Sequence, residues 1–208
     1  MGEIRVEFTR LGKRFGSLSV LAGISGTLEP GRVMIVAGPN GSGKSTLLNI
    51  LAGLVRPSRG EVSFLDGGDK VPRSRWFSLL GVAAPDMAVY EELSAIENLH
   101  FFARVRGVPA ETGRLSGLLE RLGLSRRDQT RPVATYSSGM KQRVKLAQAV
   151  IHEPEVLLLD EPSSNLDAAG HAAVAELVAD FRGRAALAVA TNDPREMAWG
   201  DAKIELVL

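Results

Sequence analysis

The hydrophobic residues of this chain fall into short runs that predict a series of buried strands. Continuous apolar runs occupy 33–37, 156–159 and 186–190, and each has the length of a strand that is covered on both faces. Near the start of the chain, apolar residues alternate with polar ones instead, which is typical of a strand with one buried face. The apolar members of that alternation are Ile4, Val6 and Phe8.

Between about residues 75 and 153 the hydrophobic pattern has a helical period. Ser94-Ala95-Ile96-Glu97 has the sequence of a capping box, in which a serine and a glutamate close the first turn of a helix. Gly107 and Gly123 predict the ends of two helices, and a further amphipathic helix is predicted from about Ser138. The pattern therefore predicts an α/β core that is interrupted by a mostly helical insertion at roughly 75–153.

Composition and charge narrow the class of protein. The 208 residues suit one domain, and the net charge of +1 gives no general reason to expect nucleic acid as a partner. The chain has no cysteine, which rules out disulfides and thiolate chemistry. We also expect no secretory signal, because Met1-Gly2-Glu3-Ile4-Arg5 has no apolar stretch, and no transmembrane span, because no run of about 18 apolar residues occurs.

A glycine-rich loop follows the first buried strand. Its residues fit the pattern G-x-x-x-x-G-K-[ST] and are Gly38, Pro39, Asn40, Gly41, Ser42, Gly43, Lys44, Ser45 and Thr46. The glycines let successive backbone N–H groups face an anion, and the helix predicted after the loop presents its positive N-terminus to the same anion. We expect Lys44 to reach the β- and γ-phosphates of a nucleotide and the Ser45 hydroxyl to bind Mg²⁺. The alternative, a chance Gly/Ser turn, is disfavoured by the flanking strand and helix.

Two acidic residues follow the second buried run. Asp160 ends the strand Val156-Leu157-Leu158-Leu159-Asp160 and is predicted to hold Mg²⁺ directly or through water. Glu161, one residue later, is predicted to orient or deprotonate an attacking water. Taken alone, the pair also fits a strand that ends in a solvated acidic turn.

Three further motifs carry a resemblance to one family. Tyr136-Ser137-Ser138-Gly139-Met140-Lys141-Gln142-Arg143 resembles the signature motif of ABC ATPases, usually written L-S-G-G-Q. Ser164-Asn165-Leu166-Asp167 resembles the D-loop, and Lys13-Arg14-Phe15-Gly16 resembles the A-loop region, where an aromatic ring stacks on adenine. The resemblance runs from about residue 4 to residue 206. The chain is therefore similar to the ATP-binding subunits of ABC transporters, in particular the small subunits of haem exporters and related export systems.

This resemblance implies a fold, cofactors and partners. The fold is an α/β P-loop NTPase core of the ABC ATPase type, with an antiparallel β subdomain and an inserted α-helical signature subdomain. The single domain, 1–208, would comprise a nucleotide-binding core at 1–74 and 154–208 and the helical subdomain at 75–153. The cofactors would be ATP and Mg²⁺. The partners would be a transmembrane permease subunit and a second ATPase subunit, on the inner face of the cell membrane.

The resemblance also assigns roles to individual residues. In the family's head-to-tail dimer, Ser137, Ser138 and Gly139 would contact ATP held by the opposite chain. Ser137 or Ser138 can equally cap the N-terminus of the following helix, and the two roles are compatible. Phe15 would stack on adenine, although a residue of this kind also fits an ordinary core position.

The sequence departs from the family pattern at two positions. The family usually has a histidine at the γ-phosphate, where this chain has Asn192, and a Q-loop glutamine, where it has Pro85. Asparagine donates a hydrogen bond but carries no charge. Proline has no side chain that can bind Mg²⁺ or its water, so the next residue, Asp86, is the candidate substitute for the Q-loop glutamine. Two hypotheses follow. Either hydrolysis persists at a lower rate because Glu161 and Lys44 remain, or the chain binds ATP and turns over poorly.

Two classes of function remain to be compared. The first is the ATP-hydrolysing subunit of a transporter, with 85–102 as the contact surface for the membrane partner and Val89, Tyr90 and Leu93 as contact residues or, alternatively, as core. The second is a soluble ABC ATPase of translation or DNA repair. One set of motifs and no sustained heptad repeat favour the transporter subunit.

Overall fold

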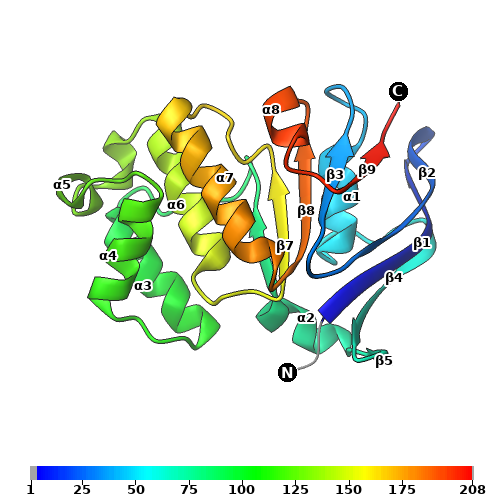
Figure 1. Ribbon diagram of the computed structural model, residues 1–208, viewed down its shortest axis with the longest axis horizontal. Helices are drawn as coiled ribbons and strands as arrows, with labels where there is room; N and C mark the ends of the chain where they lie inside the picture. The colour runs from blue at the N-terminus through cyan, green and yellow to red at the C-terminus, as the bar shows by residue number, and fades with distance from the viewer. Residues whose placement is uncertain (1–3, 208) are drawn as a thin grey trace.

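Two sheets and a group of helices make up the computed structural model, which describes residues 4–207 (Figure 1). Met1 to Glu3, the start of the stretch considered for a secretory signal, lie outside the described residues. In Figure 1 most of the helices lie to the left, one sheet stands in the middle and the other lies on the right. Among the helices within 4–207, none is both long enough and apolar enough to cross a membrane.

The central sheet is parallel and has the strand order β6-β7-β8-β3-β9. Its strands are β3 (Val33–Ala37), β6 (Leu80–Ala83), β7 (Val156–Asp160), β8 (Ala186–Thr191) and β9 (Ala202–Glu205). The strands predicted from the three continuous apolar runs are confirmed as β3, β7 and β8, which are neighbours in this sheet. The carboxyl ends of parallel strands meet at one edge, so the residues that follow them come together there.

The second sheet is antiparallel and has the order β2-β1-β4-β5. Its strands are β1 (Ile4–Phe15), β2 (Leu18–Leu28), β4 (Arg59–Asp66) and β5 (Asp69–Lys70). The alternation at the start of the chain is confirmed, because Ile4, Val6 and Phe8 are all buried. The alternation of apolar and polar residues is regular only in the first part of β1. Further along, shifts in the pairing register with the neighbouring strands interrupt it.

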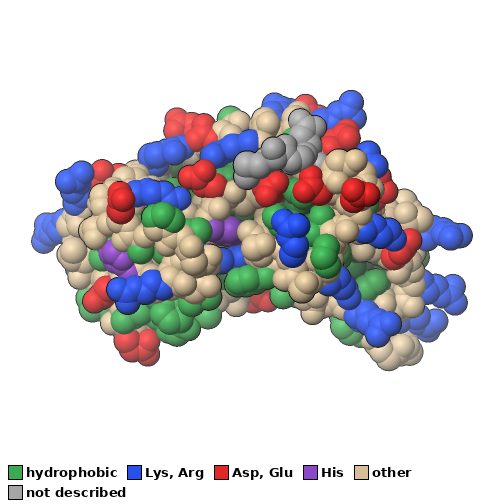
Figure 2. Space-filling model, turned by 90° about the horizontal axis from the view of Figure 1, so that it is seen from below, with side chains coloured by type: hydrophobic (Ala, Val, Ile, Leu, Met, Phe, Trp, Pro, Cys, Tyr) green, Lys and Arg blue, Asp and Glu red, His purple; other side chains and the backbone are tan. Residues whose placement is uncertain are grey.

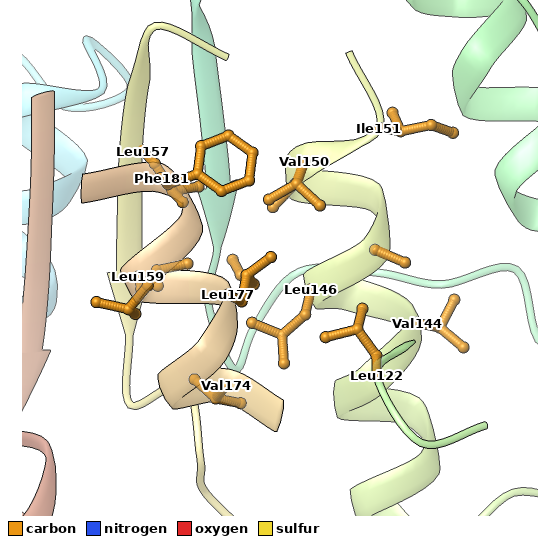
Figure 3. Close-up of a cluster of buried hydrophobic side chains, with 14 of the residues drawn as sticks. Leu122, Val144, Leu146, Val150, Ile151, Leu157, Leu159, Val174, Leu177 and Phe181 are labelled. Atoms are coloured by element: carbon orange, nitrogen blue, oxygen red, sulfur yellow. The ribbon is translucent and has the colours of Figure 1, made fainter. Parts of the chain in front are cut away.

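The pleat of the parallel sheet divides the hydrophobic residues between two cores. On β7, Leu157 and Leu159 face one core, and Val156 and Leu158 face the other. The first core is covered by α6 (Ser138–Val150) and α7 (Ala168–Arg182), as Figure 3 shows. The second core contains α1 (Lys44–Leu51) and the buried face of the antiparallel sheet. A strand between two cores has no polar face, which explains the continuous apolar runs.

The predicted helical insertion contains one strand. Its helices are α2 (Arg73–Leu79), α3 (Ala95–Arg106), α4 (Thr112–Arg121), α5 (Arg126–Gln129), the 3-10 turn η1 (Val133–Thr135) and α6, and a short α8 (Pro194–Met197) follows β8. Strand β6, which pairs with β7, is the exception to the mostly helical structure predicted for 75–153. Glycine at position 81 lets this strand pass close to α6, because an added Cβ would lie 2.2 Å from the Ala149 carbonyl oxygen. The division of the chain into a core and a helical subdomain stays a prediction.

Helix α3 begins and ends where the sequence predicts. The capping box is confirmed: the Ser94 side chain accepts a hydrogen bond from the Glu97 backbone N–H, and the Glu97 carboxylate accepts one from the Ser94 N–H. Gly107 ends the helix in a left-handed conformation. The helix is therefore closed at both ends by local contacts.

Asn98 ties the loop before α3 to this helix, and its removal is expected to destabilise the fold. Its buried amide accepts a hydrogen bond from the Tyr90 N–H (2.8 Å) and donates to the Tyr90 (2.9 Å) and Ser94 (3.0 Å) carbonyls. Asn98→Ala leaves these backbone groups without their partner, which we expect to lower the free energy of unfolding by about 2 kcal/mol. Urea unfolding measures the change. Glu92→Ala, at an exposed position in the same loop, is the control, and an equal effect of both changes would contradict this role for Asn98.

Candidate functional site

The glycine-rich loop joins β3 to the first turn of α1. Lys44 is the first residue of that helix, and Gly43 before it has a φ of +96°. Gly38 has even less room for a side chain, because an added Cβ would lie 2.5 Å from the Ser42 Oγ and 2.6 Å from the Leu206 carbonyl oxygen. Only glycine fits this crowded turn of the backbone. The loop therefore presents backbone rather than side chains at the N-terminus of α1, as anion binding requires.

Lys44 is folded back onto the loop that precedes it. Its side chain is buried, and its ammonium donates hydrogen bonds to the carbonyl oxygens of Gly38 (2.8 Å) and Pro39 (3.1 Å). Both acceptors belong to the loop itself. The ammonium is thus held at the loop, where a phosphate oxygen can replace a carbonyl as its acceptor.

A cavity of about 320 Å³ opens at this loop. Its lining comes from β2, from the loop with the start of α1, and from the end of β7, and comprises Val20, Asn40, Gly41, Gly43, Lys44, Ser45, Thr46 and Glu161. The structure therefore brings Glu161 to the cavity of the glycine-rich loop, although more than 100 residues separate them in the chain. Val20 was not singled out from the sequence, since a lone valine in a strand carries no chemical signal.

Asp160 lies buried at the end of β7 and lacks a partner for one carboxylate oxygen. Its Oδ1 has no hydrogen bond within the described residues. Burial raises the pKa of Asp160, and a hydrogen bond with the Ser45 side chain opposes that rise. An unpartnered buried carboxylate oxygen beside a serine hydroxyl is an oxygen-only donor set of the kind that Mg²⁺ prefers, so these two residues fit the ion.

Glu161 has a left-handed backbone, which is unusual for a residue with a side chain. Its φ is +46°, and its N–H donates to the Ala190 carbonyl oxygen on β8 at 2.8 Å. This hydrogen bond fixes the turn that follows β7. Such a conformation costs of order 1 kcal/mol and is common at functional sites. The turn directs the backbone away from the strand, while the Glu161 side chain lines the cavity.

Asn192, which follows β8, contacts the glycine-rich loop directly. Its Nδ2 donates to the Asn40 Oδ1 at 3.0 Å. The side chain is exposed, and the bond joins residues that are 152 positions apart. The structure thus places the residue at the family's histidine position beside the phosphate loop. Its role toward the γ-phosphate stays a prediction.

Phe15 is not a core residue, so that alternative is wrong. Its side chain is 52% exposed at the turn between β1 and β2, beside Gly16. An aromatic ring that is exposed on a hairpin turn adds little to the hydrophobic core. It is available to stack on a flat ligand.

The signature residues begin helix α6. Ser137 is its N-cap and accepts a hydrogen bond from the Met140 N–H at 3.2 Å, so the predicted capping role is confirmed for Ser137. Ser138 and Gly139 form the first turn. Gly139 packs against the D-loop, since an added Cβ would lie 2.6 Å from the Asn165 carbonyl oxygen. The lining of the glycine-rich-loop cavity includes none of Ser137, Ser138 and Gly139.

Half-buried cations on the polar face of α6 contact other segments of the chain. The Lys145 ammonium donates to the carbonyl oxygen of Pro85, at the expected Q-loop position, and Arg143 pairs with Asp167 of the D-loop at 2.7 Å. Asp86 lies beside Pro85. The pKa of Asp160 is raised mainly by burial, and the negative charge of Asp86 adds a smaller contribution in the same direction. The sequence predicts only an amphipathic helix here, and such a pattern does not distinguish a bonded cation from a solvated one.

Glu196 on α8 is a further residue that the sequence did not reveal. It is buried, and its Oε1 accepts a hydrogen bond from the Ser163 N–H at 2.9 Å. The contact joins the segment after Glu161 to the helix after Asn192. A single glutamate on a short helix resembles a solvated residue in sequence, so no pattern predicted it.

Comparisons with known proteins point to one family. A family model described as ABC transporter matches residues 21–164. The lantibiotic transport ATP-binding protein SrtF of Streptococcus pyogenes is 33% identical over 177 residues, which cover 85% of this chain and 75% of that protein. The daunorubicin resistance ATP-binding protein DrrA3 of Streptomyces coeruleorubidus is 36% identical over 89% of this chain, and the uncharacterized ABC transporter ATP-binding protein YdbJ of Bacillus subtilis is 36% identical over 82%. The chain spans 59% and 54% of the lengths of these last two proteins.

Solved structures show the same fold. A putative ABC transporter ATP-binding protein from Pyrococcus furiosus superimposes with a TM-score of 0.84 at 24% identity, over 97% of both chains. The dimeric structure of MJ0796, a bacterial ABC transporter cassette, gives 0.85 at 24% identity, over 97% of this chain and 94% of that one. The two sheets and the inserted helices are therefore arranged as in these cassettes.

Proposed function

Because this chain belongs to the ABC transporter family, we propose that it is an ATP-hydrolysing subunit that drives transport through a separate transmembrane partner. The observation that carries the proposal is the cavity at the glycine-rich loop, which Lys44, Ser45 and Glu161 line together. One wall supplies phosphate-binding groups, and the other supplies an acid that can act on water.

The chain's own groups can hold each part of ATP. The loop from Gly38 to Thr46 would bind the β- and γ-phosphates through backbone N–H groups, and the Lys44 ammonium would exchange a carbonyl acceptor for a phosphate oxygen. Phe15 would stack on adenine. Ser45 and Asp160 would hold Mg²⁺, which when bound neutralises negative charge on the phosphates. Glu161 would accept a proton from the attacking water or orient it.

The signature residues suit a site that two chains complete. Ser137, Ser138 and Gly139 form a helix N-terminus with an anion-binding geometry, yet they lie outside their own chain's phosphate cavity. In the proposed head-to-tail dimer they would contact ATP on the opposite subunit. The solved MJ0796 cassette, which has the same fold, is dimeric, and this supports a dimer of some kind for the present chain.

A groove at the C-terminal end of α1 suits the membrane partner. It has a volume of about 560 Å³ and is lined by residues of α1, α2, β6 and α3 and of the segments that follow α1 and β6. The lining includes the exposed side chains of Leu54, after α1, and Phe77, on α2. Close to it in sequence, Tyr90 is 46% exposed and packs on Phe101, so it is not core. Val89 and Leu93 are half-buried. Figure 2 shows hydrophobic side chains gathered over the helical part of this face, and we propose that a permease segment docks there.

Co-purification tests the transporter assignment against the soluble alternative. We expect the chain, expressed with its native membranes, to be recovered in the membrane fraction with a protein that has several transmembrane spans. Identification of that partner would also indicate the cargo. Names among the relatives include lantibiotic transport, Fe(3+) import and daunorubicin resistance, so the haem-exporter-like subtype stays a prediction. Recovery only with ribosomes or DNA would contradict the assignment.

Replacement of Asn192 tests whether this position slows hydrolysis. Asn192 can offer only a neutral hydrogen bond, whereas a protonated histidine offers a charge-assisted one of roughly twice the strength. We expect Asn192→His to raise kcat by about five-fold, and Asn192→Ala to lower it, in steady-state ATPase assays of the purified chain. If the histidine and alanine variants have the same kcat, position 192 makes no contact that matters in the transition state.

A further inference from the structure

Lys13 contacts one face of the Phe15 ring. Its ammonium lies over that ring, 4.7 Å from the centroid. The same ammonium donates a hydrogen bond to the Arg56 carbonyl oxygen at 2.8 Å. Two independent contacts therefore define its position, which distinguishes it from a mobile surface lysine.

The Phe15 side chain belongs to neither of the two hydrophobic cores. The side chain is 52% exposed, and the next residue, Gly16, has a left-handed backbone at the turn between β1 and β2. An exposed ring on a turn samples several rotamers unless a neighbour restrains it. Lys13, two residues earlier on the same strand, can supply this restraint, because its ammonium lies over the ring.

The acceptor of Lys13 belongs to the segment that follows the phosphate-loop helix. Residues 54 and 55 donate backbone hydrogen bonds to the Asn49 carbonyl oxygen in the last turn of α1. Two further bonds join the same segment to β1: the Ser58 N–H donates to the Gly12 carbonyl oxygen (2.8 Å), and the Arg14 N–H donates to the Ser58 Oγ (3.1 Å). The ring of Phe15 is thus positioned relative to α1, whose first residue is Lys44.

We propose that Lys13 is a positioning residue for the base of the bound nucleotide and that it acts through Phe15. Because the ammonium covers one face of the ring, a base can stack only on the other. The cation also draws electron density from the ring, which strengthens stacking on the free face. The proposal deepens the ATP-binding function proposed above and depends on it.

A purely electrostatic effect on the phosphates is the competing explanation. Lys13 lines a cavity of about 800 Å³ together with three arginines, Arg10, Arg14 and Arg59, and a single acid, Glu61. In such a basic environment any lost cation could weaken the binding of an anion. The two explanations differ for a ligand without a base. Positioning predicts no effect on tripolyphosphate, and electrostatics predicts equal effects on tripolyphosphate and nucleotide.

Lys13→Met tests the proposal, because methionine keeps an apolar stem but loses the cation and the donor. We expect titration calorimetry with Mg²⁺ and a non-hydrolysable ATP analogue to show a rise in Kd of about two- to five-fold, with tripolyphosphate binding unchanged. Lys13→Arg should restore the affinity, since guanidinium keeps both contacts. Lys70→Met, which removes another lysine of the same sheet, 3.9 Å from Glu61, is the matched control and should bind as the parent does.

Phe15→Leu separates this proposal from the one it rests on. In the Phe15→Leu background, Lys13→Met should cause no further loss of nucleotide affinity. A loss that persists there, an equal loss for tripolyphosphate, or an unchanged Kd in Lys13→Met with Phe15 intact overturns the role of Lys13. If Phe15→Leu alone leaves the nucleotide Kd unchanged, then Phe15 is not the base platform, and that part of the proposed function fails first.

Discussion

Replacement of Glu161 by glutamine is expected to reduce kcat for ATP hydrolysis by roughly 10²- to 10⁴-fold, the usual contribution of a general base. Glutamine keeps the size of the side chain and can still line the cavity, but it cannot accept the proton of an attacking water at neutral pH. Nucleotide affinity should change little, because the phosphate-binding groups lie on the loop and on α1. Single-turnover and steady-state assays with the purified chain, together with direct binding of ATP, measure the two effects separately.

Glu153 offers a matched control for this change. It is also a glutamate with a left-handed backbone, with φ of +53° against +46° for Glu161, and it lies in the exposed turn between α6 and β7. Glu153→Gln therefore makes the same chemical change at a similar backbone conformation, away from the cavity. We expect it to hydrolyse ATP at the parent rate. Equal turnover by Glu161→Gln and the parent would show that Glu161 is not the catalytic base.

The second large effect is expected for Lys44→Met. The parent ammonium makes two hydrogen bonds to loop carbonyls, and each hydrogen bond from a charged donor to a phosphate contributes about 1.5–3 kcal/mol to binding. Loss of one such bond to the phosphates corresponds to a rise in Kd of roughly 10- to 150-fold. Titration with Mg²⁺ and a non-hydrolysable ATP analogue measures Kd, and the nucleotide-induced increase in Tm should shrink accordingly.

Lys203→Met is the matched control, because it makes the same lysine-to-methionine change, with the same loss of one positive charge, at another position. Lys203 lies on β9 and pairs with Glu205 at 3.2 Å, apart from the residues that line the phosphate cavity. We expect its Kd to match that of the parent. Retained affinity in Lys44→Met would mean that the backbone N–H groups alone bind the phosphates, and the role proposed for this lysine would be wrong.

The local elements of this protein are largely determined by its sequence. A strand buried on both faces requires an unbroken apolar run, and β3, β7 and β8 each have one. A capping box needs only Ser94 and Glu97 at a spacing of three residues, so it too is visible in the chain. The phosphate loop is likewise a contiguous motif, whose glycines are required by its own backbone. Such features depend on residues that are close together in the chain.

Other features depend on contacts between distant segments, and only the tertiary structure decides them. Strand β6 reads as part of a helical region, because its four residues are too few to show a period and its pairing partner β7 lies more than 70 residues away. The exposure of Phe15 is decided by where the β1–β2 hairpin ends, and sequence left core and stacking roles open. The hydrogen bond between Asn192 and Asn40 joins two loops through the geometry of the parallel sheet.

The phosphate site shows the same division within a few residues. The sequence alone determined that Lys44 and Ser45 begin a helix after a glycine-rich loop, since the motif is local. It suggested Glu161 only by its place after a strand, and the side-by-side packing of β7, β8 and β3 brings that glutamate to the loop. The cation over Phe15 and its acceptor on Arg56 left no pattern at all, because a lysine's partner is set by the fold around it. Residues that are neighbours in the chain determine the local motifs, whereas the packing of the fold determines which distant side chains come into contact.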